Sequence, residues 1–280
     1  MNSCIHMGEE FMKLSIITIN YNNKEGLQKT IDSVIGRTWT DFEWIVIDGG
    51  STDGGKELIE RYQQHFAYWC SEPDKGVYNA MNKGINHAQG EYLLFLNSGD
   101  ALYEKDTLLK VDDLKLDADV ISGQVERMDN QQPLRFYDKS ILMQLYLDTL
   151  NHQGTFIKRS LFNDLRYDEN LRIVSDWKFW LETIVWRNAS VETIALFVAR
   201  QDMTGISNIM NPELSQERDS IKLKYFPPLL QKELDNTLHI RNSIYNIRGE
   251  YLMQNSDFFY CLGARILGVF VRIVKLFVKK

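Results

Sequence analysis

Short apolar runs alternate with amphipathic segments over the first hundred residues of the chain. The apolar runs, which predict buried strands, are residues 14–19, 43–47, 67–70 and 92–96. Between them, apolar side chains recur at helical spacing, as in Leu27, Ile31 and Val34. This alternation predicts βαβ units on a mostly parallel sheet, in which ligands bind beyond the carboxyl ends of the strands. Asp48 and Asp100 follow the second and the fourth run, so we expect both in a binding site.

The second part of the chain is less regular. Residues 116–210 combine strand patterns at 120–125 and 191–198 with two helical segments, and we expect them to complete the sheet begun by residues 13–115. The predicted architecture is therefore one α/β domain in two halves.

The two ends of the chain differ from this domain. Residues 1–12 lack the apolar segment of a secretory signal, and we expect a disordered leader. Residues 211–255 predict a helical extension broken by the prolines at 227–228. Residues 256–280 are apolar, and their last part, 265–280, carries five basic and no acidic side chains. This pattern predicts a basic amphipathic helix on an anionic membrane surface; a helix packed on the protein or on a partner is the alternative.

Composition narrows the class of protein. The chain has 280 residues, 44% of them apolar, which is enough to bury a core. Its net charge of −6 argues against a general nucleic-acid binder. Three distant cysteines form neither a disulfide framework nor a metal motif, which favours a reducing compartment, and we expect the cytoplasm.

Several common nucleotide and catalytic motifs are absent from the sequence. It contains no GxGxxG, no GxxxxGK[ST], no HExxH, no CxxC and no GxSxG. What remains is a set of acidic and polar strand ends, which suits a divalent cation and a nucleotide diphosphate.

Four blocks occur in an order typical of a known family. They read LSIITINYNNKEGLQKTIDSV, DFEWIVIDGGSTDGG, EPDKGVYNAMNKGINHAQGEYLLFLNSGD and SDWKFW. Over residues 13–210 the chain resembles the inverting, GT-A-type family 2 glycosyltransferases, especially bacterial enzymes that build colanic-acid-like capsules, exopolysaccharide or lipopolysaccharide. The resemblance implies a GT-A fold, Rossmann-like with a mostly parallel central sheet, and here a C-terminal helical extension. Residues 13–115 would bind the nucleotide sugar and residues 116–210 the acceptor.

The resemblance also implies roles for donor-side residues. Tyr21 would stack near the nucleobase, and Asp48 would bind the uracil or its ribose. Asp53 would support that loop, while Lys75 and Asn97 would lie at the nucleotide or its diphosphate.

The metal and the catalytic base follow from the last two blocks. Asp100 would be the ligand of Mg²⁺ or Mn²⁺, and Asp176 would be the base that takes the acceptor proton. The chain departs from the family pattern where Gly49, Asn97 and Gly99 replace carboxylates. We therefore expect weaker metal binding, because hard divalent cations prefer carboxylate oxygens.

Three further residues are weaker candidates for contact with the acceptor or the diphosphate. His152 precedes a strand-like segment at 155–157, Trp177 follows Asp176 at the start of a helix, and Arg200 ends a late strand. An isolated histidine or a tryptophan at helical spacing is equally compatible with a structural role. The same holds for the aspartates, which can cap turns and helices.

These observations favour an inverting glycosyltransferase that moves a hexose or N-acetylhexosamine from a UDP-sugar to a glycan. The glycan acceptor would be lipid-linked and part of the synthesis of a cell-surface polysaccharide. The enzyme would be peripheral on the inner face of the cell membrane and would need Mg²⁺ or Mn²⁺. One alternative is a non-catalytic nucleotide-sugar-binding homologue, which the thinned metal motif would suit. Another is a nucleotidyltransferase, although the first loop lacks the basic, glycine-rich sequence that such enzymes need.

Overall fold

A computed structural model describes residues 14–130, 133, 140–205 and 212–239. The chain divides into two units, residues 1–225 and 226–280. In the second unit, residues 228–239 are helical, after a break at the two prolines. The expected leader 1–12 and the expected basic helix 256–280 lie outside the described residues.

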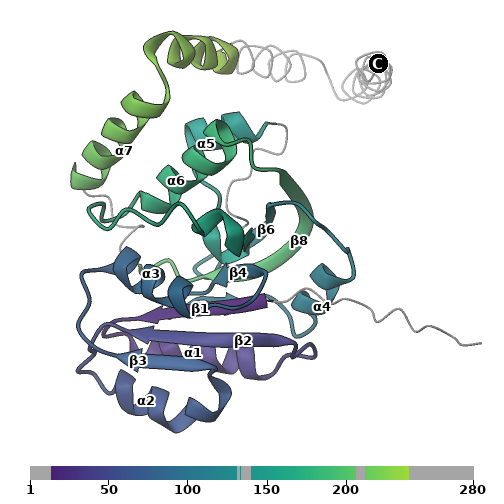
Figure 1. Ribbon diagram of the computed structural model, residues 1–280, viewed down its shortest axis with the longest axis vertical. Coiled ribbons are helices and arrows are strands. Elements are labelled where there is room, and N and C mark those ends of the chain that lie inside the picture. The colour runs from purple at the N-terminus through teal and green to yellow at the C-terminus, as the bar shows by residue number, and fades with distance from the viewer. Residues whose placement is uncertain (1–13, 131–132, 134–139, 206–211, 240–280) are drawn as a thin grey trace, which may run out of the picture. The chain divides into compact units, whose positions relative to one another are not determined.

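One mixed sheet runs through the first unit, with strand order β3-β2-β1-β4-β7-β6-β8-β5 (Figure 1). The strands are β1 (Leu14–Asn20), β2 (Phe42–Asp48), β3 (Tyr68–Ser71), β4 (Tyr92–Phe95), β5 (Ala101–Leu102), β6 (Val120–Arg127), β7 (Thr155–Lys158) and β8 (Val191–Gln201). The strands predicted from the apolar runs are confirmed. The two-residue strand β5 was not predicted, because two residues carry no periodicity.

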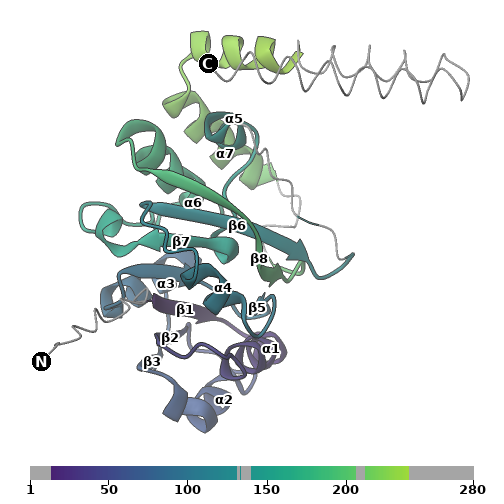
Figure 2. The same cartoon turned by 90° about the vertical axis from the view of Figure 1, so that its right-hand side faces the viewer.

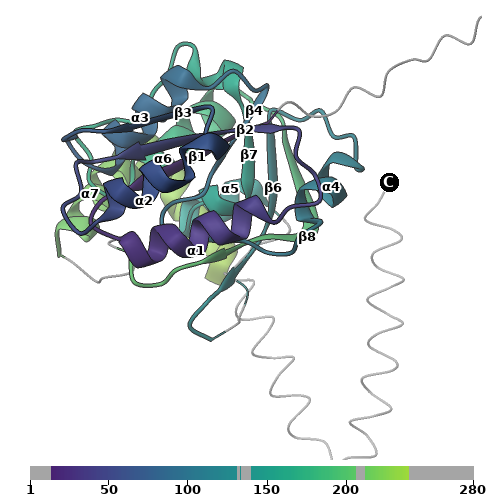
Figure 3. The same ribbon diagram turned by 90° about the horizontal axis from the view of Figure 1, so that it is seen from below.

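Helices cover both faces of the parallel part of the sheet. They are α1 (Lys24–Ile35), α2 (Gly55–Tyr62), α3 (Val77–His87), α4 (Thr107–Asp112), α5 (Ile141–Leu147), α6 (Ser175–Trp180) and α7 (Pro212–Tyr225). Figure 3 shows α1 and α2 together on one side of the sheet. There, Leu27 and Ile31 of α1 and Leu58 of α2 are buried in one apolar cluster with alternate residues of β1 and β2. On the other face of the sheet, α3 packs against β1, where the side chain of Ile17 lies directly over Gly84.

The direction of β7 determines what lies at the edge of the sheet. The strands β1, β2, β3 and β4 are parallel, whereas β7 is antiparallel to β4, with Tyr92 opposite Lys158 and Leu93 opposite Ile157. Consequently β7 begins at the edge where β4 ends, and so does the short 3₁₀ turn η2 (His152–Gly154) before it. Beyond β7, the strands β6 and β8 run parallel to each other (Figure 2).

The start of β4 lies very close to β1. The backbone N–H of Gly90 donates to Ser15 Oγ at 2.8 Å and to Glu43 Oε1 at 3.0 Å. A Cβ at Gly90 would lie 2.6 Å from the backbone nitrogen of Ser15, which cannot move without shifting the strand. The glycine is therefore required by packing.

We predict that Gly90→Ala lowers the free energy of unfolding by about 1–3 kcal/mol, because the added methyl group overlaps the backbone of β1. Gly36→Ala is the matched control, since its Cβ would meet only Asp32 O at 3.8 Å. The control should change the same free energy by less than about 0.5 kcal/mol. Urea denaturation measures both, and equal stability of the two variants would contradict the packing argument.

Candidate active site

Asp48 ends β2 and anchors the loop that follows it. The carboxylate is fully buried and accepts hydrogen bonds from Asn20 Nδ2 (2.7 Å), Ser51 Oγ (2.5 Å) and Ser71 Oγ (2.6 Å), and from the N–H groups of Gly50 (3.2 Å) and Ser51 (2.9 Å). Burial alone would raise the pKa of Asp48, but the hydrogen bonds outweigh it and the pKa is lowered. A carboxylate has about four acceptor positions. In the structure these bonds occupy both oxygens and hold the loop, and a direct contact of Asp48 with the nucleotide stays a prediction.

The other donor-side candidates lie around this loop. Asp53 accepts hydrogen bonds from the N–H groups of Lys24 (2.8 Å) and Gly55 (3.0 Å), so it connects the loop to the start of α1. The ring of Tyr21, directly after β1, is 65% exposed and available for stacking. Lys75 is exposed on the segment between β3 and α3.

Asp100 is a buried carboxylate in the turn after β4. Only 3% of the residue is exposed, and Oδ1 accepts a hydrogen bond from the N–H of Asp202 at 3.0 Å. Burial raises the pKa of Asp100 to about 7, although that bond, the charge of His152 and a bond from the Gln153 side chain act in the other direction. Without a cation, the carboxylate is thus poorly stabilised where it lies.

The oxygen atoms around Asp100 fit a hard divalent cation. The Oδ2 atom of Asp202 lies 2.6 Å from the position that a Cβ on Gly99 would take, so a carboxylate from the end of β8 occupies the place of the one missing from the motif. The Oδ1 atom of Asn97 is buried and has no hydrogen-bond partner within the described part of the chain. Among the described residues, no cluster of three His, Cys, Asp or Glu side chains is arranged for a metal. A cation would therefore need further oxygens from a diphosphate and water.

His152 connects this turn to Asp176. Its Nε2 lies 3.2 Å from Asn97 Nδ2, and its Nδ1 lies 3.2 Å from Asp176 Oδ2. A hydrogen on Nδ1 satisfies the contact with Asp176, because the carboxylate accepts it, while Nε2 faces the amide of Asn97. Since Gln153 bonds Asp100, the turn η2 brings Asp100 and Asp176 to one site. His152 is therefore central to the arrangement rather than peripheral.

Asp176 is held in one orientation at the start of α6. Oδ1 accepts from the N–H of Trp177 at 2.8 Å and lies 3.1 Å from the hydroxyl of Tyr78, whose single proton is shared with the carbonyl oxygen of Ile173. Burial, and then the charge of Asp176, raise the pKa of Tyr78 well above its usual value, so the phenol stays a neutral donor. The residue is 8% exposed, which leaves the carboxylate a small opening to solvent.

Two of the weaker candidates lie elsewhere than expected. Trp177 is 1% exposed and its Nε1 donates to Leu145 O, so its ring belongs to the core and offers no platform for a sugar. The guanidinium of Arg200 donates to Glu126 Oε2 at 2.8 Å and to Tyr103 O at 3.0 Å. Because the protein itself engages it, we do not retain Arg200 as a diphosphate ligand.

Besides Tyr78, sequence reasoning missed four residues of this site. Gln153 and Asp202 contact Asp100, and Asp74 lies against Gly49. Arg218 of α7 places its Cζ 4.2 Å from the Trp177 ring centre, and burial lowers its pKa although the charges of Asp148, Asp176 and Asp219 oppose this. Asp74 could have been noticed, because it stands in the same quoted block as Lys75; the other three carry no signal in a single sequence.

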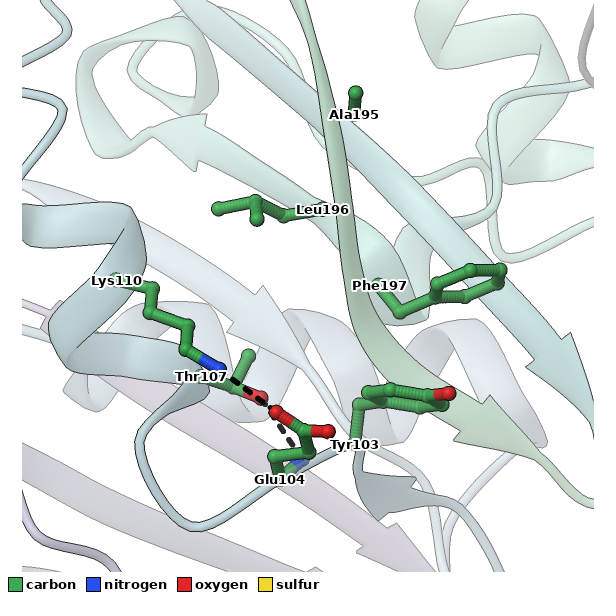
Figure 4. Close-up of a pocket in the computed structure, with 7 residues that line it drawn as sticks. All are labelled: Tyr103, Glu104, Thr107, Lys110, Ala195, Leu196 and Phe197. Atoms are coloured by element: carbon green, nitrogen blue, oxygen red, sulfur yellow. Dashed lines mark hydrogen bonds and ion pairs between the residues drawn. The ribbon is translucent and has the colours of Figure 1, made fainter.

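A pocket of about 190 Å³ lies apart from these residues, between α4 and β8 (Figure 4). Tyr103, Leu196 and Phe197 contribute to its walls. Its one cation, Lys110, is already paired with Glu104 at 2.7 Å and with Asp106. None of the candidate site residues lines it, and we assign it no role.

The fold is that of known glycosyltransferases. Residues 1–349 of Staphylococcus aureus TarS superpose with a TM-score of 0.62 at 19% identity, over 80% of this chain and 68% of that one. The mannosyltransferase PcManGT from Pyrobaculum calidifontis, solved with GDP-Man and Mn²⁺, superposes with a TM-score of 0.58 at 15% identity, over 94% of this chain and 87% of that one. These likenesses show that the chain has the GT-A fold.

The sequence of the chain places it within this class. The family described as Glycosyl transferase family 2 matches residues 15–168, and the chain belongs to this family. An uncharacterized glycosyltransferase of Mycobacterium tuberculosis is 32% identical over 215 residues, 71% of this chain and 78% of its own length. A PGL/p-HBAD biosynthesis glycosyltransferase of Mycobacterium bovis is 34% identical over 173 residues, 59% of this chain and 67% of its own length. The chain is thus a transferase enzyme, and the narrower likeness to capsule and lipopolysaccharide enzymes stays a prediction.

Within the described residues, every helix is too short or too polar to cross a bilayer.

The raised pKa of Asp100 predicts a pH-dependent stability. Its usual value is 3.8, so between about pH 4 and pH 7 the folded protein holds a proton that the unfolded chain has released. The contribution of Asp100 to the free energy of unfolding therefore falls as the pH rises through this window. Asp100→Asn lacks the titrating group and should gain stability relative to the wild type until about pH 7 and then level off. Urea denaturation with a metal chelator present measures this, and a pH-independent difference would contradict it.

Proposed function

We propose that this enzyme transfers a hexose or N-acetylhexosamine from a UDP-sugar to a glycan acceptor, with inversion at the anomeric carbon. The observation that carries the proposal is the joining of Asp100 and Asp176 by the turn that contains His152 and Gln153. One buried carboxylate would hold a cation that binds the donor phosphates, and the other lies at the same site on a different element. An inverting transfer needs this arrangement, because the acceptor attacks the face of the sugar opposite the leaving group.

On the donor side, Asp100, Asn97 and Asp202 supply oxygen atoms for Mg²⁺ or Mn²⁺. The cation supplies stabilisation of the negative charge that develops on the departing UDP. Tyr21 stacks on the nucleobase from its exposed position after β1, and Lys75 lies near the phosphates. TarS has been solved in complex with UDP and with UDP-GlcNAc, which supports a uridine nucleotide as the donor group.

On the acceptor side, Asp176 takes the proton of the attacking hydroxyl. A general base must lie within hydrogen-bond reach of that proton and in a fixed orientation. Tyr78, the N–H of Trp177 and His152 provide the orientation, each through a hydrogen bond to the carboxylate. The ring of His152 contacts both Asp176 and Asn97. It therefore holds the proposed base and a residue of the proposed sugar-donor site in a fixed relation to each other.

The acceptor is proposed to be lipid-linked and the enzyme peripheral on the inner face of the membrane. The apolar and basic composition of residues 256–280 supports attachment to an anionic surface. Such attachment would bring the site near an acceptor that cannot leave the bilayer.

A UDP-release assay on a panel of UDP-hexoses and UDP-N-acetylhexosamines, with simple glycosides as acceptors, tests the proposal. We expect Asp176→Asn to lower kcat roughly 10²–10⁴-fold, because the base is lost, while the affinity for UDP measured by calorimetry stays within about threefold. Chelation of the metal should abolish UDP release, and Mn²⁺ should restore it.

Asp106→Asn is the control, because it removes a carboxylate that only pairs with Lys110 on α4. It should leave both the rate and the affinity unchanged. A wild-type rate in Asp176→Asn would exclude Asp176 as the base. A protein that binds no UDP and releases none from any donor would overturn the proposed donor class.

A further inference from the structure

The loop after β2 has a glycine where the family pattern has an aspartate, and the carboxylate of another segment lies at that position instead. Gly49 stands where the resemblance expects a second aspartate after Asp48. A Cβ at Gly49 would lie 2.6 Å from Oδ2 of Asp74 and 3.1 Å from Cδ2 of Tyr21. The carboxylate of Asp74, from the segment between β3 and α3, therefore fills the space over Gly49 beside the exposed ring of Tyr21.

The two oxygen atoms of Asp74 are engaged differently. Oδ1 accepts a hydrogen bond from the N–H of Gly76 at 2.8 Å, which forms the turn leading into α3. Oδ2 has no hydrogen-bond partner within the described residues and lies next to Tyr21. Asp48, by contrast, is fully buried and has both oxygens bonded to its own loop. Of the two carboxylates, only Asp74 presents a free acceptor beside the aromatic ring.

We propose that Asp74 is the residue that selects the nucleobase of the donor, by accepting the N3–H of a uracil stacked on Tyr21. This proposal rests on the proposed function, because it presumes a nucleoside diphosphate sugar as the donor. A carboxylate accepts hydrogen bonds and cannot donate one. It therefore favours uracil, which carries an N–H at ring position 3, over cytosine, which has an unprotonated nitrogen there.

The geometry also favours uracil over guanine. Guanine presents two adjacent donors, N1–H and the N2 amino group, and such a pair is best bound by both oxygens of one carboxylate. Because Gly76 engages Oδ1, Asp74 offers one free oxygen, which matches the single imide N–H of uracil.

Calorimetric titration of the full chain with UDP and with CDP, in the presence of Mn²⁺, tests the proposal. The wild type should bind UDP at least about tenfold more tightly than CDP, since a hydrogen bond to a charged acceptor is worth roughly that factor or more. Asp74→Asn keeps an oxygen for the N–H of Gly76 but adds a donor and removes the charge. We expect it to weaken UDP binding roughly ten- to a hundredfold. The UDP-to-CDP ratio, meaning the affinity for UDP divided by the affinity for CDP, should fall towards or below one.

Two controls separate recognition of the base from damage to the site. Glu72→Gln removes a charge from the same segment, where the carboxylate pairs with Lys83, and should leave the ratio unchanged. Binding of inorganic pyrophosphate with Mn²⁺ lacks a nucleobase and should be equal in the wild type and in Asp74→Asn.

A carboxylate returned to position 49 provides the reciprocal test. The φ angle of Gly49 lies outside the left-handed region, so aspartate can be placed there. Gly49→Asp alone should weaken UDP binding, because its Cβ and charge meet Asp74. The double variant Gly49→Asp with Asp74→Ala should bind UDP about tenfold more tightly than either single variant, since one acceptor again stands beside Tyr21.

The outcomes separate the two proposals. An unchanged UDP-to-CDP ratio in Asp74→Asn, in a protein that prefers UDP, would overturn the role of Asp74 and leave the proposed function intact. A double variant no tighter than the single variants would likewise contradict a base-binding carboxylate at this place. A wild-type protein that binds GDP or no nucleotide at all would overturn the proposed uridine donor, and the role of Asp74 with it.

Discussion

The antiparallel pairing of β7 with β4 is the constraint on which the site depends. In a wholly parallel sheet, the chain after β4 would have to cross the sheet and enter the next strand from the opposite edge. Because β7 runs the other way, η2 stands at the edge where β4 ends. His152 and Gln153 therefore reach the turn of Asn97 and Asp100 directly. The second half of the domain then needs only to present Asp176 to His152.

Hydrogen bonds at this edge distribute the roles of the acidic residues. Asp48 accepts hydrogen bonds from its own loop and from Asn20 and Ser71 at the ends of β1 and β3, and so fixes the shape of that loop. At Asp100 the hydrogen bonds do not offset the desolvation, so its pKa is raised to about 7 and a cation would stabilise the charged form. Asp176 has three partners that orient it. These three carboxylates thus differ because burial and hydrogen bonding balance differently at each of them.

The sequence predicted the sheet better than it predicted the site. Apolar runs and helical spacing report burial, so strands such as β1 and β4 and helices such as α1 were predicted within a few residues. Periodicity cannot report whether an aromatic ring is covered, so the sequence left Trp177 open between a contact with the acceptor and a place in the core, where the structure has it. Periodicity also cannot report a tertiary contact. His152 was therefore only a weak candidate in the sequence, although in the structure its ring contacts both Asn97 and Asp176.

The thinned motifs are the clearest case of this limit. Gly49 and Gly99 read as losses along the sequence, yet Asp74 and Asp202 come from other loops and lie over them. A sequence motif describes the carboxylates of one segment, whereas a ligand contacts every carboxylate that the fold brings to the site. The resemblance to the family therefore identified the class of enzyme, and the contacts had to show which side chains carry the charge.

A crystal structure of the protein with UDP and Mn²⁺ would show where the donor binds. We expect the metal and the diphosphate at Asp100, on the side of η2 that faces Asp176, with the uracil ring on Tyr21. Electron density for the nucleotide in the pocket between α4 and β8, or a diphosphate bound away from Asp100 and His152, would contradict this expectation.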